Sequence, residues 1–172
     1  MLSEKLKRTI SNYPDFPKKG ILFRDINPVL ADAELLNELI EKILSNSYLL
    51  LSDAIVAIDA RGFIFGSILA YKLKKPLILA RKKNKLPGSL KEIEYDLEYG
   101  KDYLSIQKSA LHGLEKFIIV DDLLATGGTA KCVADILLSQ NKKVLSLIVI
   151  IELSSLKGRE KLSFPVFSEV QY

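Results

Sequence analysis

The sequence has little of the chemistry on which many enzymes depend. Its 172 residues include one cysteine, Cys132, and one histidine, His112. A single cysteine excludes an internal disulfide and a cysteine-based zinc site, and it fits the reducing cytoplasm. A single histidine excludes a His-rich metal site, and any Ser–His or Cys–His catalytic pair would have to use His112. We therefore expect any chemistry to rest on carboxylates, lysines, arginines and backbone amides.

Long hydrophobic runs are also missing. No apolar run approaches the ~20 residues that cross a bilayer, and charges interrupt the N-terminal MLSEKLKRTI, so we expect neither a membrane partner nor a signal peptide. Hydrophobic residues make up 48% and charged residues 27%, a globular composition whose length fits one domain, 1–172. The net charge of +4 suits nucleic acid or a small polyanion, so the clustering of positive charge must decide.

Short apolar runs alternate with helical patterns along the chain. The run AIVAI is short, β-branched and unalternating, as buried strands are, and a helical segment and a second run, PLILA, follow it. The same order recurs from FIIV onward, and two such units predict an α/β fold with a mainly parallel central sheet flanked by helices. The predicted strands are 54–58, 76–80, 103–107, 117–120 and 144–151, and the predicted helices are 1–12, 62–74, one capped by Asp32 and one that begins near Thr129.

Three polar loops follow the predicted strands: 59–62, 81–88 and 121–129. Ligands of such sheets bind at the carboxyl ends of the strands. In the third loop, the stretch ATGGT has glycines that allow backbone amides to converge on a phosphate, and the following helix directs its positive end there. An ordinary helix start with a threonine cap is the alternative. The basic loop RKKNKLPG, alone, is equally typical of a solvated surface loop.

Two adjacent acids, Asp121 and Asp122, precede the glycines and follow an apolar run. Partly buried neighbouring carboxylates repel each other, and vicinal sugar hydroxyls or hydrated Mg²⁺ would relieve them. The bland alternative has one aspartate in solvent and the other capping a loop. Acids beside a phosphate-binding loop favour a sugar phosphate as the ligand.

The stretch VDDLLATGGTA resembles the phosphoribosyl pyrophosphate (PRPP) binding motif of the type I phosphoribosyltransferases. The form DDLLATGG, together with FRDI, RGF, KLPG and LEYG in this order, is similar to the adenine-specific branch. The resemblance covers nearly the whole chain. It implies the type I phosphoribosyltransferase fold, with a small N-terminal hood at 1–30 and a flexible lid at about 82–104. It also implies homodimers, which the residues themselves do not indicate.

The resemblance implies that adenine and PRPP react, with Mg²⁺, to give AMP and pyrophosphate in purine salvage. The metal is expected to be held mainly by the substrate, with no direct protein ligand. The adenine hood and the lid would supply the base-binding groups and Glu98, whose role is to assist proton transfer or to order the lid. The implied site residues are Asp121 and Asp122 for the ribose; Ala125, Thr126, Gly127, Gly128 and Thr129 for the 5′-phosphate; Ala60, Arg61, Arg81, Lys82 and Lys85 for pyrophosphate; Leu22, Phe23 and Arg24 for adenine; and Glu98 with Tyr99 in the lid.

Some positions depart from the family's pattern, and two other functions remain open. Ala60, Asn84 and Asn27 stand where serine, glycine and a hydroxyl residue are usual, which affects rates and affinities but removes no charge. One alternative is a hypoxanthine- or xanthine-type enzyme, against which Phe23 argues. The other is a PRPP-sensing regulator that binds nucleic acid, for which the chain has no spare length, so we expect no nucleic-acid partner.

Overall fold

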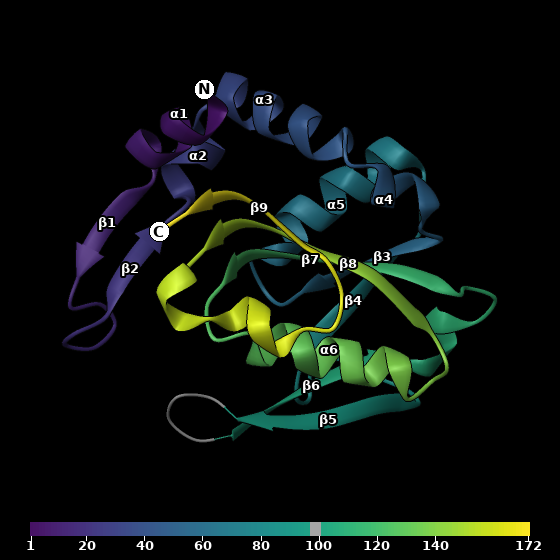
Figure 1. Cartoon of the computed structure of the whole chain (residues 1–172). Coiled ribbons are helices and arrows are strands. Elements are labelled where there is room, and N and C mark those ends of the chain that lie inside the picture. Colours follow the sequence, from purple (N-terminus) through teal and green to yellow (C-terminus); the bar gives the residue numbers. More distant parts are fainter. Residues whose placement is uncertain (97–100) are drawn as a thin grey trace. The chain divides into compact units, whose positions relative to one another are not determined.

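A mixed sheet forms the centre of the larger of two compact units, Met1–Ser45 and Asn46–Tyr172. The computed structural model describes residues 1–96 and 101–172. The strands of this sheet are β3 (Ala54–Ile58), β4 (Leu77–Lys82), β5 (Leu90–Asp96), β6 (Lys101–Gln107), β7 (Lys116–Leu124), β8 (Lys143–Glu152) and β9 (Val166–Gln171). Their order is β5-β6-β4-β3-β7-β8-β9 (Figure 1). Strands β4, β3, β7, β8 and β9 are parallel, and β6 runs antiparallel to β4 and β5.

Two helices cover opposite faces of this sheet, α5 (Gly62–Leu73) and α6 (Gly128–Leu138) (Figure 1). Helix α5 comes very close, because a Cβ on Gly66 would lie 2.5 Å from the Cβ of Ala57. The crossover through α5 leads from β3 to β4, and the crossover through α6 leads from β7 the other way, to β8. The carboxyl ends of β3 and β7 therefore meet where the strand order reverses, which is the usual ligand position in such sheets. The mainly parallel α/β fold is confirmed.

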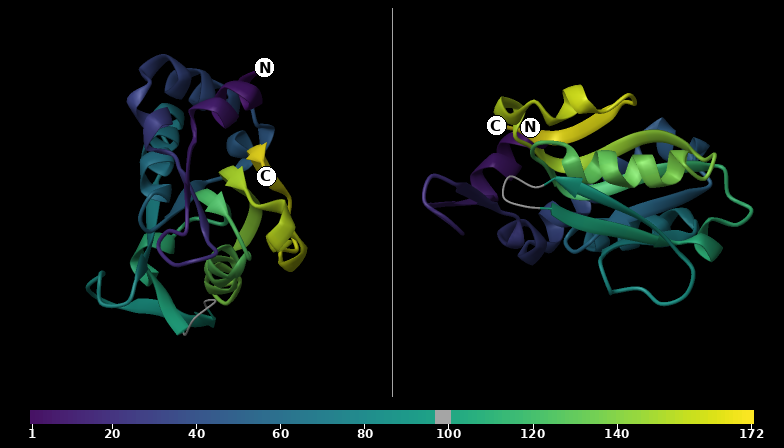
Figure 2. Two further views of the ribbon diagram at one scale, coloured as in Figure 1. Left: turned by 90° about the vertical axis from the view of Figure 1, so that its left-hand side faces the viewer. Right: turned by 90° about the horizontal axis from the view of Figure 1, so that it is seen from below.

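Smaller elements complete the Asn46–Tyr172 unit, and β5 and β9 form the two edges of its sheet. Figure 2 shows the teal β5–β6 pair and the yellow C-terminal strand from two further directions. None of the helices within the described residues combines the length and the apolar character that crossing a membrane requires. The smaller elements are α4 (Ser47–Leu51), η1 (Lys108–Leu111), η2 (Ser154–Leu156) and η3 (Gly158–Lys161).

The N-terminal unit contains one hairpin and three helices. Asp32 caps the longest helix as expected, since its Oδ1 accepts a hydrogen bond from Leu35 N at 3.0 Å. The longest helix packs against the two shorter ones, and the unit extends to Ser45. Its elements are α1 (Leu2–Thr9), β1 (Ser11–Pro14), β2 (Leu22–Asp25), α2 (Asn27–Ala31) and α3 (Ala33–Leu44).

Strands β4, β7 and β5 differ from the sequence-based expectation because of a partner strand in each case, and β9 was not predicted at all. Strand β4 continues through Arg81 and Lys82, which pair with β6. Strand β7 continues through Asp121 and Asp122, because β8 pairs with it up to the last residue of both strands, Leu124 and Glu152. The weakly periodic stretch 89–102 contains β5, which pairs with β6 along its whole length. The basic and acidic residues thus start on rigid strands rather than in loops.

Candidate active site

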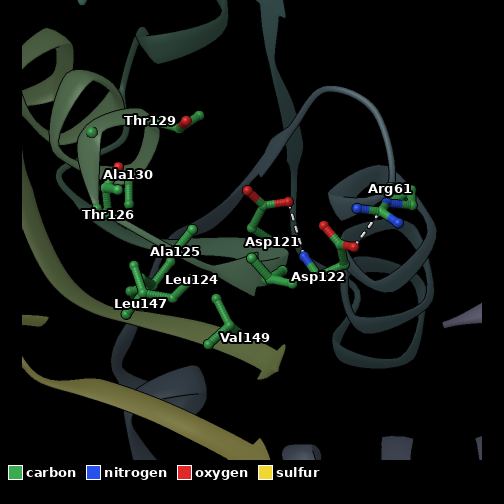
Figure 3. Close-up of a pocket in the computed structure, with 13 residues that line it drawn as sticks. Arg61, Asp121, Asp122, Leu124, Ala125, Thr126, Thr129, Ala130, Leu147 and Val149 are labelled. Carbon is green, nitrogen blue, oxygen red and sulfur yellow. Dashed lines mark hydrogen bonds and ion pairs between the residues drawn. The ribbon is translucent and has the colours of Figure 1, made fainter. Parts of the chain in front are cut away.

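A cavity of about 190 Å³ lies where β7 ends and α6 begins (Figure 3). Figure 3 shows Arg61 and Asp122 on one side of it and Thr126 and Thr129 on the other, with Asp121 between them. It therefore brings together carboxylates, a guanidinium and a helix start within one small volume. The residues that line it are Arg61, 121–130, Leu147 and Val149.

The two aspartates are adjacent on β7 and occupy a poorly solvated place. Asp122 is 5% exposed, and its backbone N donates to Asp121 Oδ1 at 2.9 Å. Burial raises the pKa of Asp121 well above its usual range, and the negative charge of Asp122 adds to this. Burial also raises the pKa of Asp122, although less. A ligand that donates hydrogen bonds or brings positive charge would stabilise both ionised carboxylates.

Arg61, at the start of α5, offsets part of this negative charge. Its Nε lies 2.8 Å from Asp122 Oδ2, and its charge acts against the effect of burial on the pKa of Asp122. The following residue, Gly62, lets the start of α5 lie directly against β7. A Cβ there would lie 2.8 Å from Val120 O and 2.9 Å from Asp121 Oδ1, so no larger residue fits without moving β7. The preceding peptide bond, between Asp59 and Ala60, is cis.

The ATGGT loop turns sharply into α6. Gly127 has φ of 80° and stands at the N-cap of the helix, a conformation that favours glycine. The first intrahelical hydrogen bond runs from Lys131 N to Gly127 O at 2.9 Å. The amides between these two residues therefore lie at the helix start, where the helix dipole is positive. The loop 125–129 can accept an anion at this end of the cavity.

The cations expected to bind pyrophosphate lie partly at or just after the ends of strands, as Arg61, Arg81 and Lys82 do, and partly in a loop, as Lys85 does. Arg81 lies at the end of β4, where its Nε is 3.2 Å from Asp59 Oδ2 and its guanidinium carbon lies 5.7 Å from the centre of the Phe63 ring. Lys82 Nζ lies 3.5 Å from Asp102 Oδ2. Arg61 thus follows β3, and Arg81 lies near the end of the adjacent strand β4, at the same edge of the sheet. Lys85 lies in the exposed loop after β4 and is not among the residues that line the cavity.

The residues expected to bind a base lie together on β2 of the N-terminal unit. Phe23 packs edge-on against Phe16, with ring centres 5.2 Å apart at 78°. Arg24 Nη1 donates to Asn12 Oδ1 across the hairpin, and Leu22 is 45% exposed. Paired strands and an aromatic contact therefore hold this three-residue segment in one shape.

The described residues supply two carboxylates to the cavity, those of Asp121 and Asp122. Over the described residues, no three His, Cys, Asp or Glu side chains lie close enough together to hold a metal ion. The two aspartates offer oxygen ligands, which Mg²⁺ prefers, but Arg61 already engages Asp122. Mg²⁺ commonly uses one or two carboxylates together with substrate phosphates, and these residues fit that arrangement.

Comparison with known proteins places this site in a family. The model of the phosphoribosyl transferase domain matches residues 26–170. An adenine phosphoribosyltransferase from Prochlorococcus marinus is 54% identical over 168 residues, which cover 98% of each chain. This chain belongs to the adenine phosphoribosyltransferases. The family membership agrees with the resemblance noted in the sequence.

Solved structures of adenine phosphoribosyltransferases share the fold. The enzyme from Thermoanaerobacter pseudethanolicus is 45% identical, with a TM-score of 0.91 and 100% of both chains covered. The enzyme from Saccharomyces cerevisiae, which was solved with adenine and an imino-altritol bisphosphate, is 36% identical, with a TM-score of 0.89 and 98% of both chains covered. The expected type I phosphoribosyltransferase fold is confirmed by these similarities.

Two residues expected in an adenine phosphoribosyltransferase, Glu98 and Tyr99, lie outside the described residues. Other contributors were not predicted at all. Leu147 and Val149 of β8 line the cavity, and Asp59 pairs with Arg81. The two apolar residues look like ordinary core residues in the sequence. Asp59 lies in the polar loop 59–62, but its pairing with Arg81 becomes visible only because β3 and β4 are adjacent.

Proposed function

We propose that this chain transfers the 5-phosphoribosyl group from PRPP to adenine, giving AMP and pyrophosphate, a reaction of purine salvage. The observation that carries the proposal is the cavity at the end of β7, where two adjacent carboxylates stand beside a glycine loop and a helix start. A sugar phosphate has vicinal hydroxyls and a phosphate, which match these two kinds of group. The full-length relatives named adenine phosphoribosyltransferase support the same reaction.

The ribose phosphate occupies the cavity in this proposal. Asp121 and Asp122 accept hydrogen bonds from the ribose hydroxyls, which compensates for the burial of their charges. The loop residues Ala125, Thr126, Gly127, Gly128 and Thr129 hold the 5′-phosphate with backbone amides and threonine hydroxyls. The positive end of α6 adds a favourable electrostatic contribution at the same place.

The pyrophosphate is held by cations at the carboxyl ends of β3 and β4. Arg61, with the neighbouring backbone of Ala60, and Arg81 bind it, and Lys82 and Lys85 add positive charge. Asp122 and Asp59 already orient the two guanidiniums through ion pairs of 2.8 Å and 3.2 Å. An arginine that is oriented before the ligand arrives loses less conformational freedom on binding.

The reaction depends more on position and charge than on covalent chemistry. Departure of pyrophosphate leaves positive charge on the ribose ring, and the adjacent carboxylates of Asp121 and Asp122 stabilise it. Arg61 and Arg81 stabilise the negative charge that develops on the leaving group. Fixing the sugar at its phosphate and at its hydroxyls orients the anomeric carbon for attack by the base.

Adenine is bound by the segment Leu22–Asp25 in this proposal. Phe23 stacks on the base, and the backbone of Leu22 and Arg24 reads its edge. A lid formed by residues of about 82–104 excludes water during the reaction and carries Glu98 and Tyr99. Glu98 either assists the proton transfer from adenine or orders the lid.

The reaction conditions follow from the same groups. Mg²⁺ accompanies PRPP and, when bound, neutralises part of the pyrophosphate charge, with its ligands coming mainly from the substrate. We place the enzyme in the cytoplasm because its one cysteine, Cys132, is a free thiol, as reducing compartments favour. We further propose that the chain is a single domain and works as a homodimer, as the family resemblance implies.

A panel of bases tests the proposal. The protein is mixed with PRPP and Mg²⁺, adenine, hypoxanthine or xanthine is added, and pyrophosphate release is followed. We expect release with adenine well above that with the other two bases. Faster release with hypoxanthine would indicate a hypoxanthine-type enzyme in which Phe23 binds another purine. Binding of PRPP with no release for any base would indicate a regulator instead of an enzyme.

A further inference from the structure

The proposed phosphate-binding loop, residues 125–129, touches a glycine that lies 31 residues after Gly127. This residue, Gly158, is the first residue of η3 and is buried, although its neighbours Lys157 and Arg159 are exposed. A Cβ on Gly127 would lie 2.4 Å from Gly158 O. A Cβ on Gly158 would lie 2.2 Å from Ala125 O and 2.9 Å from Gly127 N. The two backbones therefore meet without room for a methyl group on either side.

The next residue, Arg159, fastens η3 to the sheet. Its Nε donates to Glu152 Oε1 at 3.0 Å and its Nη2 to Glu152 Oε2 at 2.6 Å, a two-pronged ion pair. Its Nη1 also donates to Val166 O at 2.6 Å. Ser168 Oγ donates to the same Glu152 carboxylate at 2.7 Å, and Gln171 Nε2 donates to it at 3.2 Å. Donors from η3 and β9 thus converge on one acid of β8.

That acid also lies beside the point where the phosphate loop begins. Glu152 is 5% exposed and pairs in register with Leu124, the last residue of β7. Leu153 N donates to Leu124 O at 2.9 Å, which continues this contact past the end of β8. The loop 125–129 is consequently fixed at its start by Glu152 and its neighbour, and at its middle by Gly158.

We infer that Gly158 and Arg159 are positioning residues for the 5′-phosphate loop. This inference rests on the proposed binding of the 5′-phosphate by residues 125–129. Gly158 supports the backbone of Ala125 and Gly127 from the side of η3, and Arg159 holds Gly158 in place through Glu152. An amide cradle binds an anion well only if its donors are already oriented, since ordering the loop on binding costs affinity. These two residues therefore affect substrate affinity through the shape of the loop.

Two variants test the inference. Gly158→Ala places a methyl group against Ala125 O and Gly127 N, and Arg159→Lys replaces the two-pronged guanidinium with a single ammonium group. We expect Gly158→Ala to raise the KM for PRPP by about tenfold or more and to weaken ribose 5-phosphate binding, measured by calorimetry, to a similar degree. The KM for adenine should change less than about twofold. Arg159→Lys should shift both PRPP quantities in the same direction by a smaller factor.

A matched control separates position from general stability. Gly113 has φ of 74° and no atom within 4 Å of a built Cβ, and it precedes β7 at the end opposite the phosphate loop. Gly113→Ala should lower Tm through backbone strain and leave both PRPP quantities unchanged. If Gly158→Ala does not fold, we would measure amide hydrogen exchange at residues 125–129 in Arg159→Lys instead, because this variant keeps a positive charge beside Glu152. Faster exchange there than in the wild type would support the inference, and unchanged exchange would overturn it.

Three results separate the inference from the proposed function. Wild-type binding of ribose 5-phosphate with unchanged affinity in a folded Gly158→Ala would overturn the positioning role. Equal rises in the KM values for PRPP and adenine would also overturn it, since they indicate general damage. No binding of ribose 5-phosphate by the wild type would instead refute the phosphate-binding role of residues 125–129, and the positioning role with it.

Discussion

Arg61 and Asp122 form an ion pair inside the site, with Arg61 Nε 2.8 Å from Asp122 Oδ2. Arg61 follows β3, and Asp122 lies near the end of β7, so the ion pair connects the ends of two neighbouring parallel strands. The two side chains have different surroundings, since the Arg61 side chain is 36% exposed and that of Asp122 is 8% exposed. Removing the charge of Asp122 therefore leaves Arg61 in contact with solvent instead of stranded in the core.

Asp122→Asn should weaken PRPP binding without unfolding the protein. The proposed hydrogen bond from a ribose hydroxyl to a charged acceptor contributes about 1.5–3 kcal/mol, so we expect the KM for PRPP to rise by roughly tenfold or more. Tm should stay close to that of the wild type, because the exposed side of Arg61 can be hydrated. Steady-state kinetics and a thermal melt check both parts. Unchanged kinetics in a folded variant would contradict the role of Asp122 in gripping the sugar.

Asp121→Asn should change how stability depends on pH. Burial and the charge of Asp122 raise the pKa of Asp121 well above its usual range, so the folded state binds this proton more tightly than the unfolded chain does. The free energy of unfolding therefore falls as pH rises from the ordinary carboxyl range through the raised pKa of Asp121. The variant lacks this loss, so its Tm relative to the wild type should increase as pH rises above the ordinary carboxyl range of about pH 4. A difference in Tm that stays constant as pH rises would contradict the prediction.

Glu98→Ala should lower turnover more than it weakens adenine binding. A group that acts mainly in the transition state affects kcat, whereas a group that binds the substrate uniformly affects KM. Initial rates at saturating PRPP, with adenine varied, distinguish the two. Glu34→Ala, an exposed acid on α3, serves as the control and should leave kcat unchanged. A rise in the KM for adenine at constant kcat would make Glu98 a binding residue.

Cys132 should be unreactive in the folded protein. It is 2% exposed on α6, and burial raises the pKa of its thiol to about 11. At neutral pH only about one thiol in ten thousand is then a thiolate, the form that reacts. A colorimetric thiol reagent should detect no free thiol in the native protein and one after denaturation. Fast modification of the native protein would show that α6 opens readily.

The sequence was sufficient to predict the parts of the fold whose residues are buried along their whole length. Strand β3 has five buried residues and no polar interruption, and its predicted bounds are those observed. The extension of β7 through Asp121 and Asp122 was not predictable from pattern, because charged residues normally end an apolar strand. It exists because β8 supplies pairing partners for Asp121, Leu123 and Leu124.

Contacts between distant segments were the main limit of prediction. Nothing in the stretch LKGREKL distinguishes Gly158 from an ordinary loop glycine, yet it touches the phosphate loop. Strand β5 was missed because it lies at the sheet edge, where alternate residues face solvent and apolar periodicity is weak.

The contact at Gly62 limits how this protein can diverge. Only the hydrogen in the side-chain position of Gly62 separates the start of α5 from Val120 O and Asp121 Oδ1. We expect single exchanges of the charged side chains around the site to weaken the enzyme without displacing its strands. A methyl group at residue 62 would instead displace β7, together with both aspartates, in one step. In a library of single substitutions, position 62 should therefore accept fewer alternatives than the arginine that precedes it.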